Sequence, residues 1–357
     1  MPFLKLFLIP LSFLYGLLVS LRNNLFDYNF FKSKEYDVPI ISVGNLCVGG
    51  SGKSPLVEYI VELLSEQHDL AVLSRGYGRE TKGFKWVKNG SYVRDVGDEP
   101  LQIKRKYPQT TVAVSENRNI GIQKLINHNC QVILMDDGYQ HRWVKPGLNI
   151  LLTTYDNLFI NDYLLPFGTL RENRRRADRA DIIIVSKSPR PLLPLDEYRL
   201  KEQIDPALHQ KLCFSSIDYQ TPRLMYNQTP IDLKNKKIVL VTAISSSKQI
   251  VDHVKEHAEL FDHFEFRDHK YFKKREILKI IESYHNINSQ EKLILTTEKD
   301  ATRLAVFENE FKTVSLAYLP IKVKFQGKTN FNELILNYVG KNNDNKELSI
   351  SKDAVCA

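Results

Sequence analysis

The sequence predicts an α/β fold in which a parallel sheet is flanked by helices and is followed by a second, smaller α/β unit. Two observations support this prediction. Between Val38 and Cys213, short apolar runs alternate with helical stretches. Strands that are apolar on both faces and alternate with helices are typical of a parallel sheet covered on both sides. A polar stretch with two prolines, residues 218–233, then precedes a second series of alternating elements.

The first expected element is the apolar stretch from Phe3 to Leu21, in which Lys5 is the only charged residue. No small-residue cleavage site follows it, which argues against a signal peptide. A spanning helix needs about twenty apolar residues, so the length barely suffices, and Pro10 weakens that interpretation. A helix buried against the core is a further alternative. We favour a monotopic helix in the membrane interface, formed within residues 1–32.

The core domain is expected to span residues 33–217. Six β-rich runs are predicted strands: Pro39–Val43, Leu70–Ser74, Thr111–Val114, Val132–Met135, Asn149–Thr153 and Asp181–Ser186. Helical spacing lies between most of them, for example in Pro55–Glu66 and Asn117–His128. One β-hairpin is also predicted, because Phe84–Val87 and Tyr92–Val93 flank the turn signal Asn89-Gly90.

The smaller C-terminal α/β domain is expected to span residues 218–340. Its predicted elements alternate: strand Ile238–Thr242, helix Ser246–Leu260, strand Phe264–Phe266, helix Lys274–Tyr284, strand Leu293–Thr296 and a last helix through Glu333–Val339. Residues 341–357 are polar and poor in aromatics, which predicts a disordered tail. The four cysteines (Cys47, Cys130, Cys213 and Cys356) form no CxxC or Cys/His cluster, which predicts reduced thiols and no structural zinc.

A good part of the net charge of +8 comes from one run, Arg171 to Arg176, with Arg179 just beyond it. A solvated helix face is the usual explanation of such a run. Nucleic acid is not predicted as a partner, because no aromatic-interleaved basic motif accompanies the arginines. An anionic membrane surface or a phosphorylated substrate fits the run as well as a solvated face does.

The stretch Ile41–Ser54 is predicted to form a strand followed by a glycine-rich phosphate loop. The glycines allow backbone N–H groups to turn inward, and the following helix N-terminus favours an anion. Lys53 would neutralise the β- and γ-phosphates of a nucleotide, and the Ser54 hydroxyl would hold Mg²⁺. The common pattern G-x-x-x-x-G-K-[ST] is not met, because Cys47 occupies its first glycine position and the nearest upstream glycine is Gly44. The candidate nucleotide-binding residues of the loop are Cys47, Val48, Gly49, Gly50, Ser51, Gly52, Lys53 and Ser54.

The apolar run Val132 to Met135 ends in Asp136 and Asp137. A buried strand with this ending delivers a carboxylate to the C-terminal edge of a sheet, where ligands bind in open α/β folds. In a P-loop enzyme this is the Walker-B position, so Asp136 would hold or orient Mg²⁺. The alternative is that both aspartates cap a turn with Gly138.

Three further sites carry candidate residues. Asp98 stands at an expected helix start, where an N-cap is the simpler role. Glu172 would lie in the first turn of a helix and could be a dipole partner. His269 follows Asp268 after a strand end, which makes it a candidate general base or the partner of one.

Several motifs together resemble one family, in order and spacing over about Pro2 to Val339. They are Ser42-Val43-Gly44-Asn45-Leu46, the loop through Ser54-Pro55, Ser74-Arg75-Gly76-Tyr77-Gly78-Arg79, Gly97-Asp98-Glu99-Pro100, Asp136-Asp137-Gly138-Tyr139-Gln140-His141-Arg142, Leu165–Glu172, Asp268-His269 and Thr296-Thr297-Glu298-Lys299-Asp300. The chain resembles the tetraacyldisaccharide 4'-kinases, lipid A pathway enzymes of Gram-negative bacteria. That family shares the displaced glycine, so Cys47 is not evidence against it.

The resemblance implies a P-loop NTPase-type core and transfer of the ATP γ-phosphate to the 4' hydroxyl of a lipid-linked glucosamine disaccharide 1-phosphate. It implies that Ser54, Asp136 and Glu172 surround Mg²⁺. It further implies that Asp98 is the base and that His269 assists it. Catalytic roles would extend to Lys53, Asp137 and Arg171, with Gln140 positioning phosphates.

The resemblance also implies a peripheral or monotopic location on the cytoplasmic face of the bacterial inner membrane, without an obligate protein partner. Two other functions compete. One is a membrane-peripheral P-loop NTPase that uses hydrolysis for transport or assembly, and the other is a non-catalytic nucleotide-binding adaptor. A GTPase would be expected to carry an Asn-Lys-x-Asp motif, which Glu298-Lys299-Asp300 does not supply.

Overall fold

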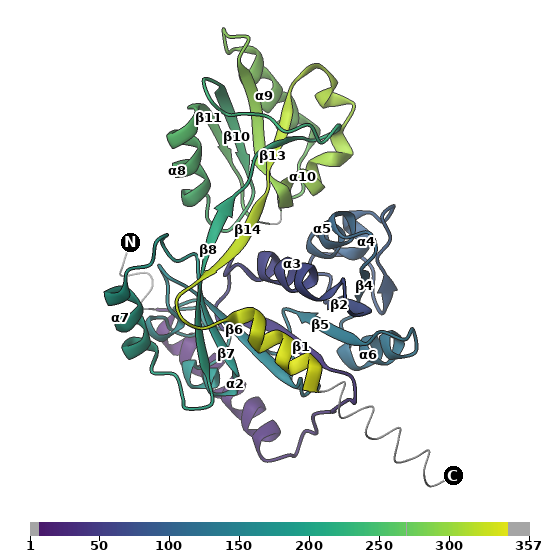
Figure 1. Cartoon of the computed structure of the whole chain (residues 1–357), viewed down its shortest axis with the longest axis vertical. Helices are drawn as coiled ribbons and strands as arrows, with labels where there is room; N and C mark the ends of the chain where they lie inside the picture. The colour runs from purple at the N-terminus through teal and green to yellow at the C-terminus, as the bar shows by residue number, and fades with distance from the viewer. Residues whose placement is uncertain (1–6, 269, 342–357) are drawn as a thin grey trace.

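Two sheets organise the chain in the computed structural model, which describes residues 7–268 and 270–341 (Figure 1). The larger sheet has nine strands in the order β14-β8-β7-β6-β1-β5-β2-β4-β3, and the smaller has five in the order β11-β10-β12-β13-β9. Residues 1–6, His269 and residues 342–357 lie outside the described residues. The predictions for the start of the N-terminal helix, for His269 and for the tail from residue 342 onward therefore fall outside them as well.

The larger sheet is parallel from β8 to β4, and its two edge strands, β14 and β3, run antiparallel to their neighbours. Its strands are β1 (Ile40–Asn45), β2 (Leu70–Ser74), β3 (Lys85–Trp86), β4 (Thr111–Val114), β5 (Val132–Asp136), β6 (Leu148–Thr154), β7 (Ile182–Ser186), β8 (Lys211–Tyr219) and β14 (Ile321–Gln326). All six strands that the sequence predicts in this region are therefore confirmed.

Helices cover both faces of this sheet, as the apolar runs predict. Along β1, Ile41 and Val43 belong to one core cluster and Ile40 to another, so successive side chains enter opposite layers. The helices are α3 (Lys53–Leu64), α4 (Val93–Val96), α5 (Asp98–Lys106), α6 (Arg118–Ile126), α7 (Pro194–Ile204), the 3₁₀ helices η1 (Phe159–Asn161) and η2 (Arg174–Arg179), and a last helix over residues 331–341.

The smaller sheet forms a second unit, drawn at the top of Figure 1. Its strands are β9 (Arg223–Leu224), β10 (Lys237–Thr242), β11 (Glu259–Glu265), β12 (Lys292–Thr297) and β13 (Leu316–Leu319). Its helices are α8 (Lys248–His257), α9 (Lys274–His285), α10 (Glu298–Leu304) and the 3₁₀ helices η3 (Ala305–Phe307) and η4 (Glu310–Thr313). The helix expected over Ser246–Leu260 is shorter, because the chain enters β11 at Glu259.

Two adjacent strands connect the units. β8 leads out of the larger sheet, and β14 returns beside it, with Ile321 opposite Tyr219 and Gln326 opposite Phe214. Figure 1 shows both strands running between the two units. The helix over residues 331–341 then packs on the larger sheet through Phe331, Ile335 and Val339.

This return differs from the expected domain 218–340. Residues 321–341 belong to the larger sheet and its core cluster, although the sequence assigns them to the second unit. The apolar pattern of the last helix shows that it is buried, but it does not show against which sheet. We propose that the second folding unit extends from β9 to β13.

The predicted hairpin around Asn89-Gly90 is wrong. The turn is present at Asn89 and Gly90, but β3 pairs with β4 through Lys85 and Trp86, while Val93 begins the short helix α4. The local turn signal is therefore correct, and tertiary pairing with β4 decides the strand partner.

The N-terminal segment forms the 19-residue helix α2 (Ile9–Asp27). Its inner side is polar: Ser12 Oγ donates to the Leu164 carbonyl at 2.8 Å and Tyr15 Oη to the Arg171 carbonyl at 2.9 Å. Its outer side is apolar, with seven large side chains at least 46 % exposed: Ile9, Leu11, Phe13, Leu14, Leu17, Leu18 and Leu21. Among the described helices, none combines the length and hydropathy needed to cross a bilayer.

Candidate active site

The phosphate loop connects β1 to α3 and opens at the C-terminal edge of the larger sheet. Gly49 and Gly52 have φ of 116° and 84°, values that only glycine adopts readily, and Gly52 is the N-cap of α3. A Cβ on Gly50 would meet Ser245 Oγ, so a loop of the second unit lies over this turn. The loop therefore requires glycine at Gly49 and Gly52 for its backbone conformation, and Gly50 lies against Ser245.

Gly44 has a packing role that the sequence alone does not reveal. It lies within β1, outside the loop, and a Cβ there would approach the Tyr139 backbone nitrogen to 2.9 Å. The displaced glycine of the motif thus allows the segment after Asp137 to pass close to β1.

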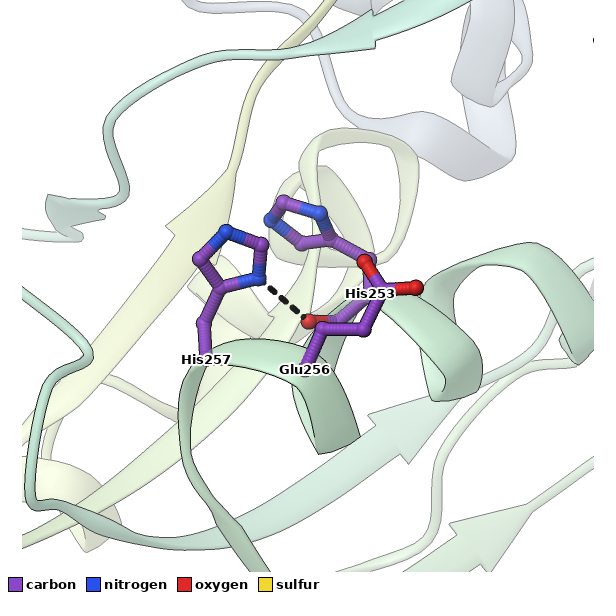
Figure 2. A group of neighbouring side chains, drawn as sticks. All are labelled: His253, Glu256 and His257. Carbon is purple, nitrogen blue, oxygen red and sulfur yellow. Dashed lines mark hydrogen bonds between the residues drawn. The ribbon is translucent and has the colours of Figure 1, made fainter.

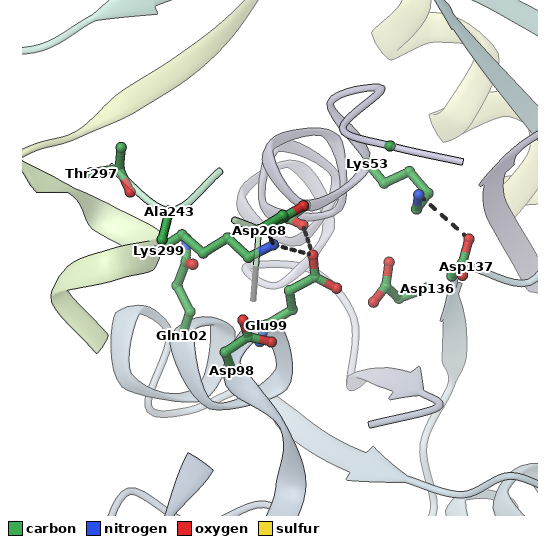
Figure 3. Close-up of polar contacts among 12 residues, drawn as sticks. Lys53, Asp98, Glu99, Gln102, Asp136, Asp137, Ala243, Asp268, Thr297 and Lys299 are labelled. Carbon is green, nitrogen blue, oxygen red and sulfur yellow. Dashed lines mark hydrogen bonds and ion pairs between the residues drawn. The ribbon is translucent and has the colours of Figure 1, made fainter. Parts of the chain in front are cut away.

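Lys53 is held in the loop by polar neighbours on two strand ends. Its Nζ donates to Asn45 Oδ1 at 3.2 Å and lies 3.5 Å from Asp137 Oδ1 (Figure 3). Burial would raise the pKa of Asp137, but the charges of Lys53 and Arg171 outweigh burial and lower it. Asp137 therefore remains a carboxylate and counterbalances Lys53.

Asp136 ends β5 and is 1 % exposed. Its Oδ2 accepts from Ser74 Oγ at 3.0 Å, whereas its buried Oδ1 has no hydrogen-bond partner among the described residues. Burial, followed by the charges of Glu99 and Asp137, raises the pKa of Asp136 to about 7. A buried carboxylate oxygen without a partner, near other acidic side chains, fits a divalent cation such as Mg²⁺, which binds oxygen ligands.

The Ser54 hydroxyl faces a second carboxylate. Ser54 Oγ donates to Glu99 Oε1 at 3.0 Å, and the same oxygen lies 3.1 Å from Lys299 Nζ of α10. Ser54, Asp136 and Glu99 thus form a group of oxygen ligands at the N-terminus of α3. The sequence identifies Glu99 only as part of a motif, since its role depends on how α5 is oriented.

Asp98 lies at the first position of α5 and is buried. Its Oδ1 accepts from the Glu99 backbone N–H at 2.9 Å, and its Oδ2 accepts two hydrogen bonds from Arg303, one of them from Nε at 2.9 Å. Arg303 comes from α10, so this ion pair joins the two units. Burial would lower the pKa of Arg303, but the charges of Asp98 and Asp300 raise it.

Arg171 and Gln140 support the same edge of the sheet. Arg171 Nη1 lies 3.1 Å from Asp137 Oδ2, and Gln140 Nε2 donates to the Asn45 carbonyl at 2.8 Å. Cys47 and Leu170 form a β-bridge, and Val48 N–H donates to the Thr169 carbonyl at 2.8 Å. The segment from Thr169 to Arg171 therefore holds the start of the phosphate loop.

Glu172 is buried, but its surroundings differ from those that the sequence predicts. It precedes the 3₁₀ helix η2 and does not lie in the first turn of a helix, because Asn173 is the N-cap of η2. It pairs with Arg179, accepts from Asn23 Nδ2 at 3.2 Å and lies 3.9 Å from Arg22. Among the described residues, its hydrogen bonds and ion pairs are with η2 and α2. The assignment of Glu172 to Mg²⁺ stays a prediction.

His269 is outside the described residues, whereas its neighbour Asp268 is described. Asp268 Oδ1 lies 3.3 Å from Lys299 Nζ and 3.9 Å from Arg303 Nη2. Figure 3 shows Asp98, Glu99, Asp268 and Lys299 gathered at one end of the site, with Lys53, Asp136 and Asp137 at the other. The sequence does not indicate Arg303, because an arginine on a short helix carries no recognisable motif.

One cavity of about 1000 Å³ connects most of these groups, although Asp98 and Arg303 are not among its lining residues. It extends from the phosphate loop and Asp136 to Lys299 and Asp268 of the second unit, and on its other side to Tyr15, Val19 and Arg22 of α2. The arrangement can hold a polyphosphate at one end and can receive a second molecule from the side of α2.

Comparison with known proteins identifies related chains. The sequence profile of the family described as tetraacyldisaccharide-1-P 4'-kinase matches residues 4–340. A tetraacyldisaccharide 4'-kinase of Bacteroides thetaiotaomicron is 40 % identical over 97 % of this chain and 96 % of that protein. The corresponding protein of Flavobacterium johnsoniae is 40 % identical over 96 % of this chain and 99 % of its own length.

A solved structure is also similar. The crystal structure of LpxK from Aquifex aeolicus in complex with ATP has a TM-score of 0.74 and 28 % identity, and the match covers 94 % of this chain and 99 % of that one. The resemblance seen in the sequence motifs is thereby confirmed, and so is the P-loop α/β fold class. This chain belongs to the tetraacyldisaccharide-1-P 4'-kinase family.

Proposed function

We propose that this member of the family uses ATP to phosphorylate the 4' hydroxyl of a tetraacyldisaccharide 1-phosphate, a precursor of lipid A. The observation that carries the proposal is the single cavity that joins the phosphate loop to the helix with the exposed apolar side. A nucleotide phosphate chain fits the loop end, and a sugar headgroup can enter from the side of α2.

At the loop end, the backbone N–H groups and Lys53 bind the phosphates of ATP and neutralise charge on the transferred phosphoryl group. Ser54, Asp136 and Glu99 would hold Mg²⁺, with Glu172 as the further ligand that the sequence predicts. When bound, the cation stabilises negative charge on the phosphate oxygens. Arg171 positions Asp137, and Gln140 positions Asn45 at the end of β1. Because Lys53 contacts both Asp137 and Asn45, these two residues also position Lys53.

On the side of the second unit, Asp98 is the proposed base that receives the proton of the sugar hydroxyl. A sugar hydroxyl has a high pKa, so placement and partial proton removal matter more than a strong nucleophile. In this structure Arg303 binds the Asp98 carboxylate. The proposal therefore requires Asp98 to exchange at least one hydrogen bond with Arg303 for one with substrate, and His269 would assist it. Linking this exchange to closure of the two units would limit wasteful ATP hydrolysis.

Phosphate transfer from γ-labelled ATP to the disaccharide lipid tests the proposal. We expect label on the lipid with the wild type and a loss of at least about 100-fold with Asp98→Asn, which keeps an oxygen for Arg303. Glu66→Gln on the exposed surface is the control. Label released only as inorganic phosphate would favour the transport or assembly NTPase, and nucleotide binding without turnover would favour an adaptor.

The location that we propose is the cytoplasmic face of the inner membrane, with α2 as a monotopic anchor. The polar inner side of α2 is fixed to the protein, so its exposed leucines face outward. Arg176 Nη1 lies 2.6 Å from Asp27 Oδ2 and so fixes η2 beside the end of α2, while Arg174 and Arg175 stay exposed. An apolar helix face flanked by arginines suits an anionic bilayer surface.

Replacing Leu14, Leu18 and Leu21 by glutamine tests the anchor without touching the contacts of Ser12 and Tyr15. We expect the protein to leave the membrane fraction and lipid turnover to fall, while ATP binding is retained. Glutamines at the exposed Leu193, Leu195 and Leu208 provide the matched control, since these residues lie outside α2. Equal fractionation of the two triple variants would contradict the anchor.

A further inference from the structure

The outer surface of α8 carries two imidazoles and a carboxylate that the kinase reaction does not use. His253, Glu256 and His257 stand at positions i, i+3 and i+4 of this helix, so they share one face. Their potential ligand atoms all lie within 4.8 Å of one another. Figure 2 shows the two rings side by side on the last turns of α8, with the carboxylate of Glu256 next to them.

The ring of His257 is held in one tautomer. Its Nδ1 lies 2.8 Å from the His253 backbone carbonyl, and a carbonyl oxygen only accepts hydrogen bonds. Nδ1 therefore carries a proton, and in the neutral tautomer the free lone pair is on Nε2. A hydrogen bond from the other ring nitrogen to a backbone carbonyl is a frequent support of metal-binding histidines.

The ring of His253 is also held in place. It stacks on Tyr219 with ring centroids 4.3 Å apart and an interplanar angle of 24°, and its centroid lies 4.3 Å from that of His257. Both rings are thus restricted in their motion before any ion arrives, which reduces the side-chain entropy lost on binding, although small rotations are still needed. Exposed Glu256 places a carboxyl group beside the two imidazole rings.

We propose that His253, Glu256 and His257 form a binding site for a divalent transition-metal ion of the Zn²⁺ class. Two imidazole nitrogens and one carboxylate oxygen are ligands that Zn²⁺, Co²⁺ and Ni²⁺ accept, whereas Mg²⁺ and Ca²⁺ prefer oxygen ligands alone. Zinc–nitrogen bonds are about 2.0–2.1 Å long, so the ligand atoms need to approach one another by small side-chain rotations. Water would complete the coordination, because the site is open to solvent.

The position of the site suggests what it does. Tyr219 is the last residue of β8 and pairs with Ile321 of β14, so His253 contacts the two-stranded connection between the units. Tyr219 also lines the large cavity. A bound ion would fix the ring of His253 against Tyr219 and thereby stabilise the connection. This inference does not depend on the proposed kinase activity.

Equilibrium titration of the full chain with Zn²⁺ tests the site, after chelator treatment and without nucleotide or Mg²⁺. We expect the wild type to bind one more equivalent than His257→Ala, and binding at that site to be at least about tenfold weaker in Glu256→Gln. His285→Ala is the matched control, because His285 is an exposed histidine that ends α9. It should bind Zn²⁺ like the wild type.

Two further measurements separate ligand loss from misfolding. Co²⁺ should give visible d–d absorption with the wild type and with His285→Ala, and this absorption should be lost in His257→Ala. Zn²⁺ should also raise the thermal unfolding midpoint of the wild type more than that of Glu256→Gln, since an ion that binds only the folded state stabilises it. Equal Zn²⁺ uptake by the wild type, His257→Ala and Glu256→Gln would overturn the proposal.

Discussion

The two ends of the site are built in different ways (Figure 3). At the phosphate end, Lys53, Asp136 and Asp137 all come from the C-terminal edge of one parallel sheet. At the opposite end, Asp98 of the first unit is bound by Arg303 of the second. The three charged side chains of the first end all belong to one unit, whereas the ion pair of the second end depends on how two units are held together.

This difference has a physical consequence. The groups at the phosphate end are set by strand register, which the hydrophobic core fixes. The ion pair between Asp98 and Arg303 costs desolvation free energy, because both charges are buried, and it gains free energy from their mutual attraction. We therefore expect the loss of the phosphate-end cation Lys53 to affect turnover, and the loss of the opposite cation Arg303 to affect stability as well.

The largest effect is expected from Arg303→Met. It removes the guanidinium that pairs with the buried carboxylates Asp98 and Asp300, so the free energy of unfolding should fall by about 3–5 kcal/mol. Urea unfolding followed by circular dichroism measures this loss. Arg275→Met on the exposed side of α9 serves as control and should change little. An unchanged midpoint for Arg303→Met would show that the two ends do not differ in this way.

Lys53→Ala should have the next largest effect, and on turnover alone. Loss of a cation aimed at the transferred phosphate should lower kcat/KM by about 10²–10³-fold. The thermal midpoint should stay close to that of the wild type. Lys88→Ala, at an exposed position, should keep full activity. A variant of Lys53 that unfolds readily would contradict the separation between the two ends.

Asp136→Asn should raise stability while it abolishes turnover. Burial raises the pKa of Asp136 to about 7, from an ordinary value near 4, so at pH 8 the folded state holds a charge that burial disfavours. The amide removes this cost, and we expect a gain on the order of 1–3 kcal/mol at pH 8.

The stability gain from Asp136→Asn should depend on pH. Between about pH 4 and pH 7 the folded wild type binds a proton that the unfolded chain has released, so its stability falls as the pH rises through this window. The gain from Asp136→Asn should therefore shrink towards zero near pH 4. Urea unfolding at pH 5 and pH 8 measures it, and a gain independent of pH would count against the burial of a charge.

The smallest effect is expected from Lys322→Ala, in the connecting strand β14. Its Nζ lies 3.1 Å from Glu62 Oε2, but both side chains are well exposed. Exposed pairs contribute about 0.2–1 kcal/mol. Urea unfolding should therefore show a loss within this range. A loss as large as that of Arg303→Met would mean that ion pairs contribute to stability regardless of their burial.

Much of the phosphate end could be predicted from the sequence. The glycines, Lys53 and Ser54 are consecutive, and Asp136 follows an apolar run whose burial is readable from its composition. The six core strands were predictable for the same reason. Local patterns report local structure and burial, and the sheet brings the strand ends together without further information.

The rest could not be predicted, because it depends on long-range packing. Arg303 approaches Asp98 across 205 positions of sequence, and Glu99 becomes a candidate ligand only through the orientation of α5. The false hairpin and the misplaced last helix have the same origin. Each pattern was correct about turn or burial, while the partner lay elsewhere in the chain.

The paired connection through β8 and β14 constrains how the molecule can move. A single-strand link would act as a swivel, whereas two hydrogen-bonded strands side by side resist twisting apart and bend mainly along one direction. The second unit would then approach the phosphate loop by rotation about a single axis. Opening and closing would follow the same path, so Ser245 would return to the turn at Gly50 in every cycle.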